Sequence, residues 1–203
     1  MFEKCKLKGL HCRKEDVRAI LHILAPDETL QRRRKRLRRR TYFSKGPNYI
    51  WHLDSYDKLK RFGFCINGCI DGYSRHVMWV NVYKTSSDPR IIGGYYMETI
   101  MAAGGCPRVL RSDLGTENTH VRDFQRFLRQ NHNDSMAGKC SMIQGASTSN
   151  QRIECWWAFF RKECSDFWIE TFSGMEAVGL FDGTFVDISL LQFCFMHLIQ
   201  VIT

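Results

Sequence analysis

With 203 residues, 44% of them hydrophobic, the chain is long enough to bury one core, so we expect a single domain with appendages rather than two full domains. The net charge of +9 comes from the first 49 residues, which hold 15 Lys and Arg against 5 Asp and Glu. Because the nine cysteines follow no apolar secretory segment and form no Cys-x-x-Cys pair, we expect a reduced, intracellular protein without a disulfide framework or structural zinc.

Residues 1–30 are expected to contain one short amphipathic helix. Its apolar residues recur at helical spacing and stop before Pro26, which cannot continue a helix. We interpret this segment as a candidate remnant of a DNA-binding module. The residues expected on its apolar face are Val17, Ile20, Leu21 and Leu24.

Residues 31–47 form a predicted basic arm. Eight of the ten residues 31–40 are Arg or Lys, and none is acidic. Such a run repels itself unless it meets an anion, which is typical of a nucleic-acid-binding arm or a nuclear-import signal; a merely solvated charge run is the alternative. We therefore expect DNA as a partner, salt-sensitive phosphate binding and a nuclear location. The residues expected to contact DNA here are Arg32, Arg33, Arg34, Lys35, Arg36, Arg38, Arg39 and Arg40.

Three strand patterns follow the arm. Residues 48–54 alternate between two faces, and the predicted strand ends at the carboxylate of Asp54. Two further β-rich runs, within residues 61–70 and 75–83, are joined by the turn pair Asp71-Gly72. These patterns predict a three-stranded antiparallel meander.

A helix, a strand and a second helix are predicted next. The first helix has Asp88 as its N-cap, Pro89 at its first position and Gly104 at its end. The strand, residues 107–113, again ends on a carboxylate, Asp113. The second helix is expected to bury a stripe of apolar residues, and the polar stretch after it, residues 131–145, is interpreted as a loop. The stripe consists of Val121, Phe124, Phe127 and Leu128.

A long helix is predicted from Thr148, where Thr148 and Gln151 stand at the spacing of a capping box. Glu154 falls in its first turn. Trp156 and Trp157 invite a base-stacking interpretation, but their helical spacing with other apolar residues favours core packing. The apolar residues at this spacing are Ile153, Trp157, Phe160, Cys164 and Trp168.

Four polar residues lie on or near the exposed flank of this helix and are candidates for contacts with DNA phosphates; a solvated helix face is the alternative. The last segment, residues 173–203, is predicted to be an apolar helix that packs on the domain or on a partner, and it is too short and too interrupted to span a bilayer. We expect no membrane association. The four candidate DNA contacts are Asn150, Arg152, Arg161 and Lys162.

The carboxylates of Asp54, Asp113 and Glu154 occupy three special places in this pattern. A crossover helix puts the fourth strand parallel to the first, so Asp54 and Asp113 should emerge at one end of the sheet, with Glu154 against that edge. Converging acids repel one another unless cations neutralise them, and oxygen-only ligands suit Mg²⁺ or Mn²⁺ in a two-metal phosphoryl-transfer site. Each acid alone could be structural, as a turn or helix-terminus residue. Asp57 and Asp71 are secondary candidates for metal ligands, because a turn contact is enough to explain each of them.

At these residues, in the stretches "WHLD", "CIDGYSRHVMWV", "RSDLGTEN" and "NQRIECWW", the chain resembles the integrase catalytic core of the DDE superfamily. More specifically, it resembles transposon-derived eukaryotic proteins described as integrase core domain-containing. The resemblance implies an α/β, RNase H-like fold with a mixed five-stranded sheet flanked by helices, in which residues 48–172 form the catalytic core. It also implies that Asp54, Asp113 and Glu154 are the catalytic and metal-binding residues.

The resemblance further implies Mg²⁺-dependent DNA cleavage and strand transfer, with a homo-oligomer as an expected assembly. Two departures from the family pattern stand out: Leu114 where many integrases carry Asn, and 40 residues between Asp113 and Glu154. Two alternatives stay open. One is a domesticated DNA-binding or scaffold protein that keeps the fold without catalysis, and the other is a nuclease that uses water as its only nucleophile.

Overall fold

In the computed structural model of the chain, residues 2–28 and 42–203 are described, and the chain divides into two compact units, Met1–Tyr42 and Phe43–Thr203. The predicted DNA contacts of the basic arm, residues 32–40, lie outside the described residues. The first unit contains α1 (Phe2–Leu7) and α2 (Lys14–Leu24), which confirms the predicted helix. Of its apolar face only Val17 is buried, because two short helices offer little surface against which to pack.

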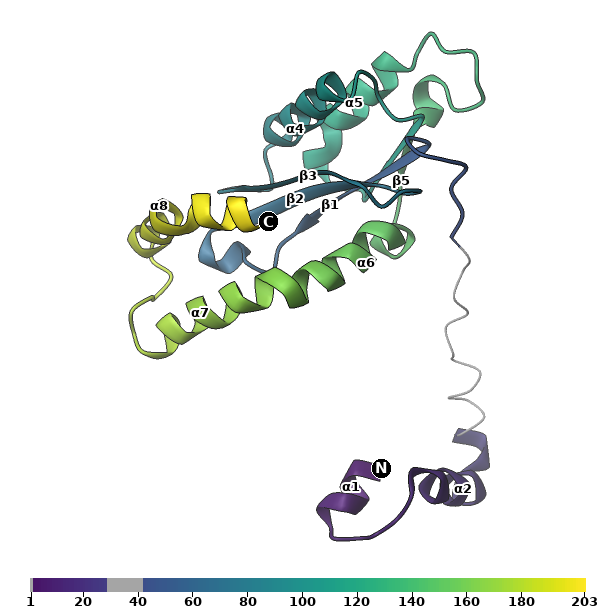
Figure 1. Cartoon of the computed structure of the whole chain (residues 1–203), viewed down its shortest axis with the longest axis vertical. Coiled ribbons are helices and arrows are strands. Elements are labelled where there is room, and N and C mark those ends of the chain that lie inside the picture. Colours follow the sequence, from purple (N-terminus) through teal and green to yellow (C-terminus); the bar gives the residue numbers. More distant parts are fainter. Residues whose placement is uncertain (1, 29–41) are drawn as a thin grey trace. The chain divides into compact units, whose positions relative to one another are not determined.

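The second unit is built on a five-stranded sheet in the order β3-β2-β1-β4-β5 (Figure 1). The first three strands pair antiparallel as the predicted meander, β4 lies parallel beside β1, and β5 pairs parallel with β4. The predicted mixed five-stranded α/β sheet is therefore confirmed. The strands are β1 (Ile50–Tyr56), β2 (Cys65–Asp71), β3 (Val77–Tyr83), β4 (Val109–Ser112) and β5 (Met142–Gln144).

Two strand predictions are wrong in detail. β1 does not end at Asp54 but continues to Tyr56, because the residues after Asp54 still pair with β2, as in the pair Tyr56↔Ile66. The stretch 131–145 is not only a loop, since it contains β5. Met142 pairs with β4 and is buried, and a strand of three residues is too short to produce a recognisable alternation.

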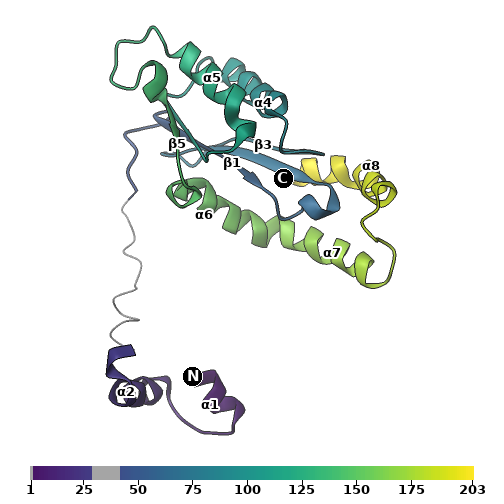
Figure 2. The same ribbon diagram turned by 180° about the vertical axis from the view of Figure 1, so that it is seen from behind.

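Helices cover both faces of the sheet (Figures 1 and 2). On one face, α4 (Pro89–Ala102) and α5 (Thr119–Leu128) pack in a core with Trp51 and Leu53 of β1. On the other face, α6 (Gln151–Phe160), α7 (Asp166–Ala177) and α8 (Phe185–Ile202) surround a second core. Because successive side chains of a strand alternate, His52 and Asp54 point to the α6 side of the sheet.

The helix beginning at Asp88 is confirmed, since its side chain accepts a hydrogen bond from the backbone N–H of Arg90. The stripe predicted for α5 is only partly correct. Val121 is buried, but Phe127 is 67% exposed, and Phe124 and Leu128 are each 37% exposed. The helix instead turns Gln125 inward, one turn after Val121, where its amide donates to the carbonyl of Pro107 and its carbonyl accepts from Tyr96.

The long helix begins later than predicted. Its first residue is Gln151, preceded by Asn150, so the predicted capping box at Thr148 is wrong: the residue at the helix start caps no backbone group of its own helix. The five predicted core residues, from Ile153 to Trp168, are all buried. A turn of π-helix, Arg161–Ser165, joins α6 to α7 and adjusts the helical register between them.

The C-terminal helix α8 packs one side on β3, as predicted for packing on the domain. Its Gln200 bridges the edge strand by accepting from the backbone N–H of Val82 and donating to the carbonyl of Val80. Within the described residues, α8 is long and apolar enough to cross a membrane by length and composition, contrary to the prediction that it is too short. Its outer side, with Phe185 and Phe193, is exposed.

Candidate active site

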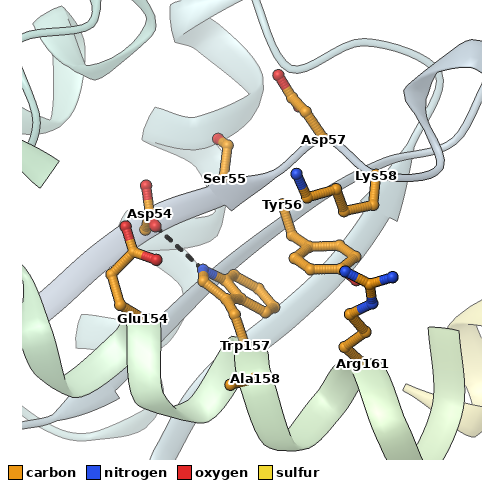
Figure 3. A pocket seen from close by; sticks show the side chains of 9 residues that line it. All are labelled: Asp54, Ser55, Tyr56, Asp57, Lys58, Glu154, Trp157, Ala158 and Arg161. Carbon is orange, nitrogen blue, oxygen red and sulfur yellow. Dashed lines mark hydrogen bonds between the residues drawn. The ribbon is translucent and has the colours of Figure 1, made fainter. Parts of the chain in front are cut away.

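The site forms where β1 faces α6. Asp54 projects from β1 toward the helix, and its Oδ2 accepts a hydrogen bond of 3.1 Å from Nε1 of Trp157 (Figure 3). Trp157 is 4% exposed, and its ring packs against Tyr56 with 5.1 Å between ring centroids. The expected core packing of Trp157 is confirmed, and the structure adds a second role: a rigid, buried indole holds the carboxylate of Asp54.

Glu154 lies one turn before Trp157 on α6 and lines the same pocket as Asp54, a hollow of about 480 Å³. The pocket has two electrostatic ends. Asp54 and Glu154 gather at one end, whereas Lys58 and Arg161 lie toward the other (Figure 3). Sequence reasoning missed Lys58, because a lysine just after a strand carries no periodic or motif signal. The remaining lining residues are Ser55, Tyr56, Asp57, Trp157 and Ala158.

The electrostatics of Asp54 reflect both burial and crowding by acids. The pKa of Asp54 is raised from 3.8 to about 7, first by burial and then by the negative charges of Glu154 and Asp113, while N–H donors from Ser55 and Trp157 oppose the rise. The negative charge of Asp113 is thus one of the causes of the raised pKa of Asp54. An ionised Asp54 would be favoured by a positive ion beside it.

Asp113 follows β4 directly, and its Oδ1 accepts a hydrogen bond of 2.9 Å from Nδ2 of the buried Asn118. The same amide donates to Glu117, whose pKa is raised by burial and then by the charges of Asp113 and Asp57. Glu117 was missed by sequence reasoning, although it stands in the "DLGTEN" stretch. A Cβ at Gly115 would lie 1.9 Å from Oε1 of Glu117, so a glycine leaves room for this carboxylate.

The donor chemistry of the site fits a hard divalent cation, because the groups are carboxylates and the charges of their neighbours raise the pKa of Asp54 and of Glu117. The side chains do not form a closed cage, however. Within residues 2–28 and 42–203, no three His, Cys, Asp or Glu side chains stand together closely enough to hold a metal ion. Asp113 is also not among the residues that line the pocket of Asp54 and Glu154.

The structure distinguishes the other predicted residues. Asn150 is 1% exposed and bonded to β1, so its predicted contact with DNA is wrong. Arg152 is partly buried, whereas Arg161 and Lys162 are exposed. Nε of Arg161 donates to Asp166 over 2.8 Å. The DNA contacts of these three basic residues stay predictions.

The two secondary candidates have the expected turn contacts. Asp71 is 2% exposed and accepts from the backbone N–H groups of Asn48 and Ser74, which explains it structurally. Asp57 lies just beyond β1 and accepts from Nζ of Lys60 over 3.2 Å, although it also borders the pocket.

The sheet order, the parallel β1–β4 pair and the carboxylates on β1, after β4 and at the start of α6 define an RNase H-like domain. The sequence model of the integrase core domain family matches residues 41–202, and the chain belongs to this family. Among the curated proteins, none matches the chain. Membership makes the second unit an integrase-like, nucleic-acid-binding domain, with a sheet of the kind that the sequence resemblance implied.

Proposed function

We propose that this chain is a transposon-derived, integrase- or transposase-like enzyme that cuts DNA phosphodiester bonds and joins the ends to a second DNA. Asp54, Asp113 and Glu154 would hold Mg²⁺ or Mn²⁺. The observation that supports this most directly is that Asp54 and Glu154, 100 positions apart, line one pocket in which the charge of Asp113 also acts on Asp54. When bound, divalent ions supply activation of the attacking hydroxyl and stabilisation of the leaving oxygen.

The chain's own residues suit a nucleic acid strand that crosses the pocket. Trp157 holds Asp54 in one orientation, so this carboxylate is positioned before any ligand arrives. Lys58 and Arg161, at the other end of the pocket, would bind a phosphate neighbouring the one that reacts. A pocket with an acidic and a basic end therefore fits a polyanion that brings cations with it.

Outside the pocket, the basic arm would supply sequence-independent attraction to DNA and a nuclear-import signal. Arg152 on α6 and Lys162 on the π-helical turn after it would add phosphate contacts. A homo-oligomer is part of the proposal, since joining two DNA ends to one target requires more than one active site.

The test is the nicking of supercoiled plasmid by the purified full chain in Mn²⁺ at low salt. Plasmid serves because any phosphodiester can react, so the natural DNA ends need not be known. We expect Asp113→Asn and Glu154→Gln to abolish nicking. The matched control is Glu170→Gln, which removes an exposed carboxylate on α7 and should nick like the parent. Equal nicking by the parent and both site variants would contradict the proposed chemistry.

A second candidate is a domesticated DNA-binding or scaffold protein without catalysis. The observation in its favour is that the carboxylates of the described residues form no group of three ready to hold a metal ion. This candidate predicts plasmid binding without nicking in the parent and in both variants. The nuclease alternative is separated by its products: with a labelled donor end, it yields cut DNA but no joined strands.

A further inference from the structure

A buried polar contact ties the start of α6 to β1. His52 of β1 is 0% exposed and Asn150, the residue before α6, is 1% exposed. Nδ1 of His52 and Oδ1 of Asn150 are 2.7 Å apart, and Nδ2 of Asn150 donates to the carbonyl of Leu53 over 2.8 Å. We call these two side chains the His52–Asn150 latch. Buried hydrogen bonds of this kind are short, directional and costly to break on one side only.

The hydrogen-bond geometry defines the role of each atom in the latch. Because the amide nitrogen of Asn150 donates to the carbonyl of Leu53, its oxygen is the group that faces His52. An amide oxygen only accepts, so Nδ1 of His52 carries the proton and donates. Both the oxygen and the nitrogen of the Asn150 amide therefore have a hydrogen-bond partner, and these two bonds define one orientation of the amide.

Asn150 does not make the helix-capping hydrogen bond that is usual at its position, which indicates that its side chain serves the contact with β1 instead. An asparagine at the start of a helix ordinarily accepts a hydrogen bond from a backbone N–H of the first turn. Asn150 makes no such cap, and α6 begins without one. The two hydrogen bonds of its side chain are directed across to β1 instead, at residues 98 and 97 positions away in the sequence.

Each side of the latch is close in sequence to one carboxylate of the site. Leu53 immediately precedes Asp54, and Glu154 lies one helical turn after Asn150. Apolar contacts of Ile153 and Trp157 also press α6 on the sheet. Such contacts are not directional and tolerate sliding, whereas the latch fixes the rotation and height of the first turn of α6 on β1.

We propose that His52 and Asn150 are positioning residues, which set the placement of Glu154 relative to Asp54 and so the cation affinity of the carboxylate site. The proposal rests on the proposed function, since it requires these carboxylates to bind a cation. It assigns to Asn150 a role inside the protein rather than on DNA, and to a buried histidine a role that involves no contact with substrate.

The test measures cation binding without any reaction. Tb³⁺ is a hard, oxygen-seeking probe, and Trp157, whose indole is bonded to Asp54, is placed to sensitise its luminescence. The full chain would be titrated with Tb³⁺ as the parent, as Asn150→Ala, as Glu154→Gln and as the double variant. We expect each single change to weaken binding about tenfold or more, as is typical for ligands and for the groups that orient them.

The double variant tests whether Asn150 acts through Glu154. If it does, the double variant should bind Tb³⁺ within about twofold of Glu154→Gln alone, because no ligand remains for the latch to place. Losses that instead multiply would show that Asn150 acts elsewhere and would overturn the proposal. Parent-like affinity in Asn150→Ala, together with a loss in Glu154→Gln, would overturn the latch and leave the metal site standing.

Two controls separate positioning from a general loss of structure. His52→Asn keeps an N–H donor at the same distance from the backbone, whereas His52→Leu removes it, so the first should bind Tb³⁺ more tightly than the second. Ile92→Ala opens a cavity in the core on the opposite face of the sheet and should lower the unfolding temperature without changing Tb³⁺ affinity. If neither Asp54→Asn nor Glu154→Gln alters Tb³⁺ binding, both the proposed function and the latch fall.

Discussion

In the absence of divalent cations, replacing Asp54 by asparagine should make the protein more stable above neutral pH. The pKa of Asp54 is raised to about 7 by burial and by the charges of Glu154 and Asp113. A group whose pKa is raised on folding stabilises the protein fully below its unfolded pKa and loses that contribution as the pH rises through its folded pKa. The parent therefore loses stability as the pH rises from 3.8 toward about 7, and the variant does not.

The magnitude follows from the size of the shift. A rise from 3.8 to about 7 is about 3 pKa units, or about 4 kcal/mol at about 1.4 kcal/mol per unit. Asp54 is partly exposed, so water screens part of this energy and about 2 kcal/mol is a more realistic value. The variant and the parent should unfold alike near pH 4 and differ by about 2 kcal/mol near pH 8.

The assay is urea unfolding followed by tryptophan fluorescence, in chelator, at a series of pH values. Glu170→Gln is the matched control and should show no such pH-dependent gap. With saturating Mg²⁺ the order should reverse, because a bound cation favours the ionised parent and stabilises only the folded state. A gap that does not widen with pH, or a parent that is the more stable protein near pH 8 in chelator, would refute the reasoning.

Three further outcomes are expected. Trp157→Phe removes an N–H donor from Asp54, so the pH midpoint of the same stability profile should move upward; a midpoint at or below that of the parent would contradict the assignment. Gln200→Leu should cost about 1–2 kcal/mol in urea unfolding and increase light scattering, since it uncovers backbone groups of the edge strand β3; unchanged stability would show that the bridge is dispensable. Replacing the eight basic residues within 31–40 by serine should make the slope of log affinity for DNA against log salt concentration shallower by up to about 7, measured by fluorescence anisotropy. An unchanged slope would exclude the arm from phosphate binding.

Local patterns in the sequence were sufficient for most of the elements. The β1–β3 meander, the cap at Asp88 and the buried side of the α6–α7 helices were predictable, because alternation and helical spacing record which side of each element is buried. β5 was missed, because three residues cannot show a period. The α5 stripe was partly wrong because spacing alone does not tell which of several apolar side chains, such as Val121 or Phe127, will meet a partner.

The candidate site divides in the same way. Asp54, Asp113 and Glu154 could be selected from sequence, since each is a carboxylate at a strand end or helix start in a recognisable order. Their surroundings could not be selected. Lys58 carries no local signal, and Glu117 was missed within the stretch "DLGTEN". Asn150 was assigned to the outside of the protein when it lies inside.

The sequence by itself determined the kind of domain, the family and the three candidate carboxylates, because these depend on residue types and on spacing along the chain. Only the tertiary structure decided which groups surround these carboxylates. Trp157 donates a hydrogen bond to Asp54, and Asn118 donates one to Asp113. Asn150 ties the start of the helix that carries Glu154 to the carbonyl of Leu53 in β1. The physical reason is distance along the chain. Two of these partners, Trp157 and Asn150, lie 103 and 97 residues from the group they contact, where no local periodicity links them and only the packing of α6 on β1 brings them together.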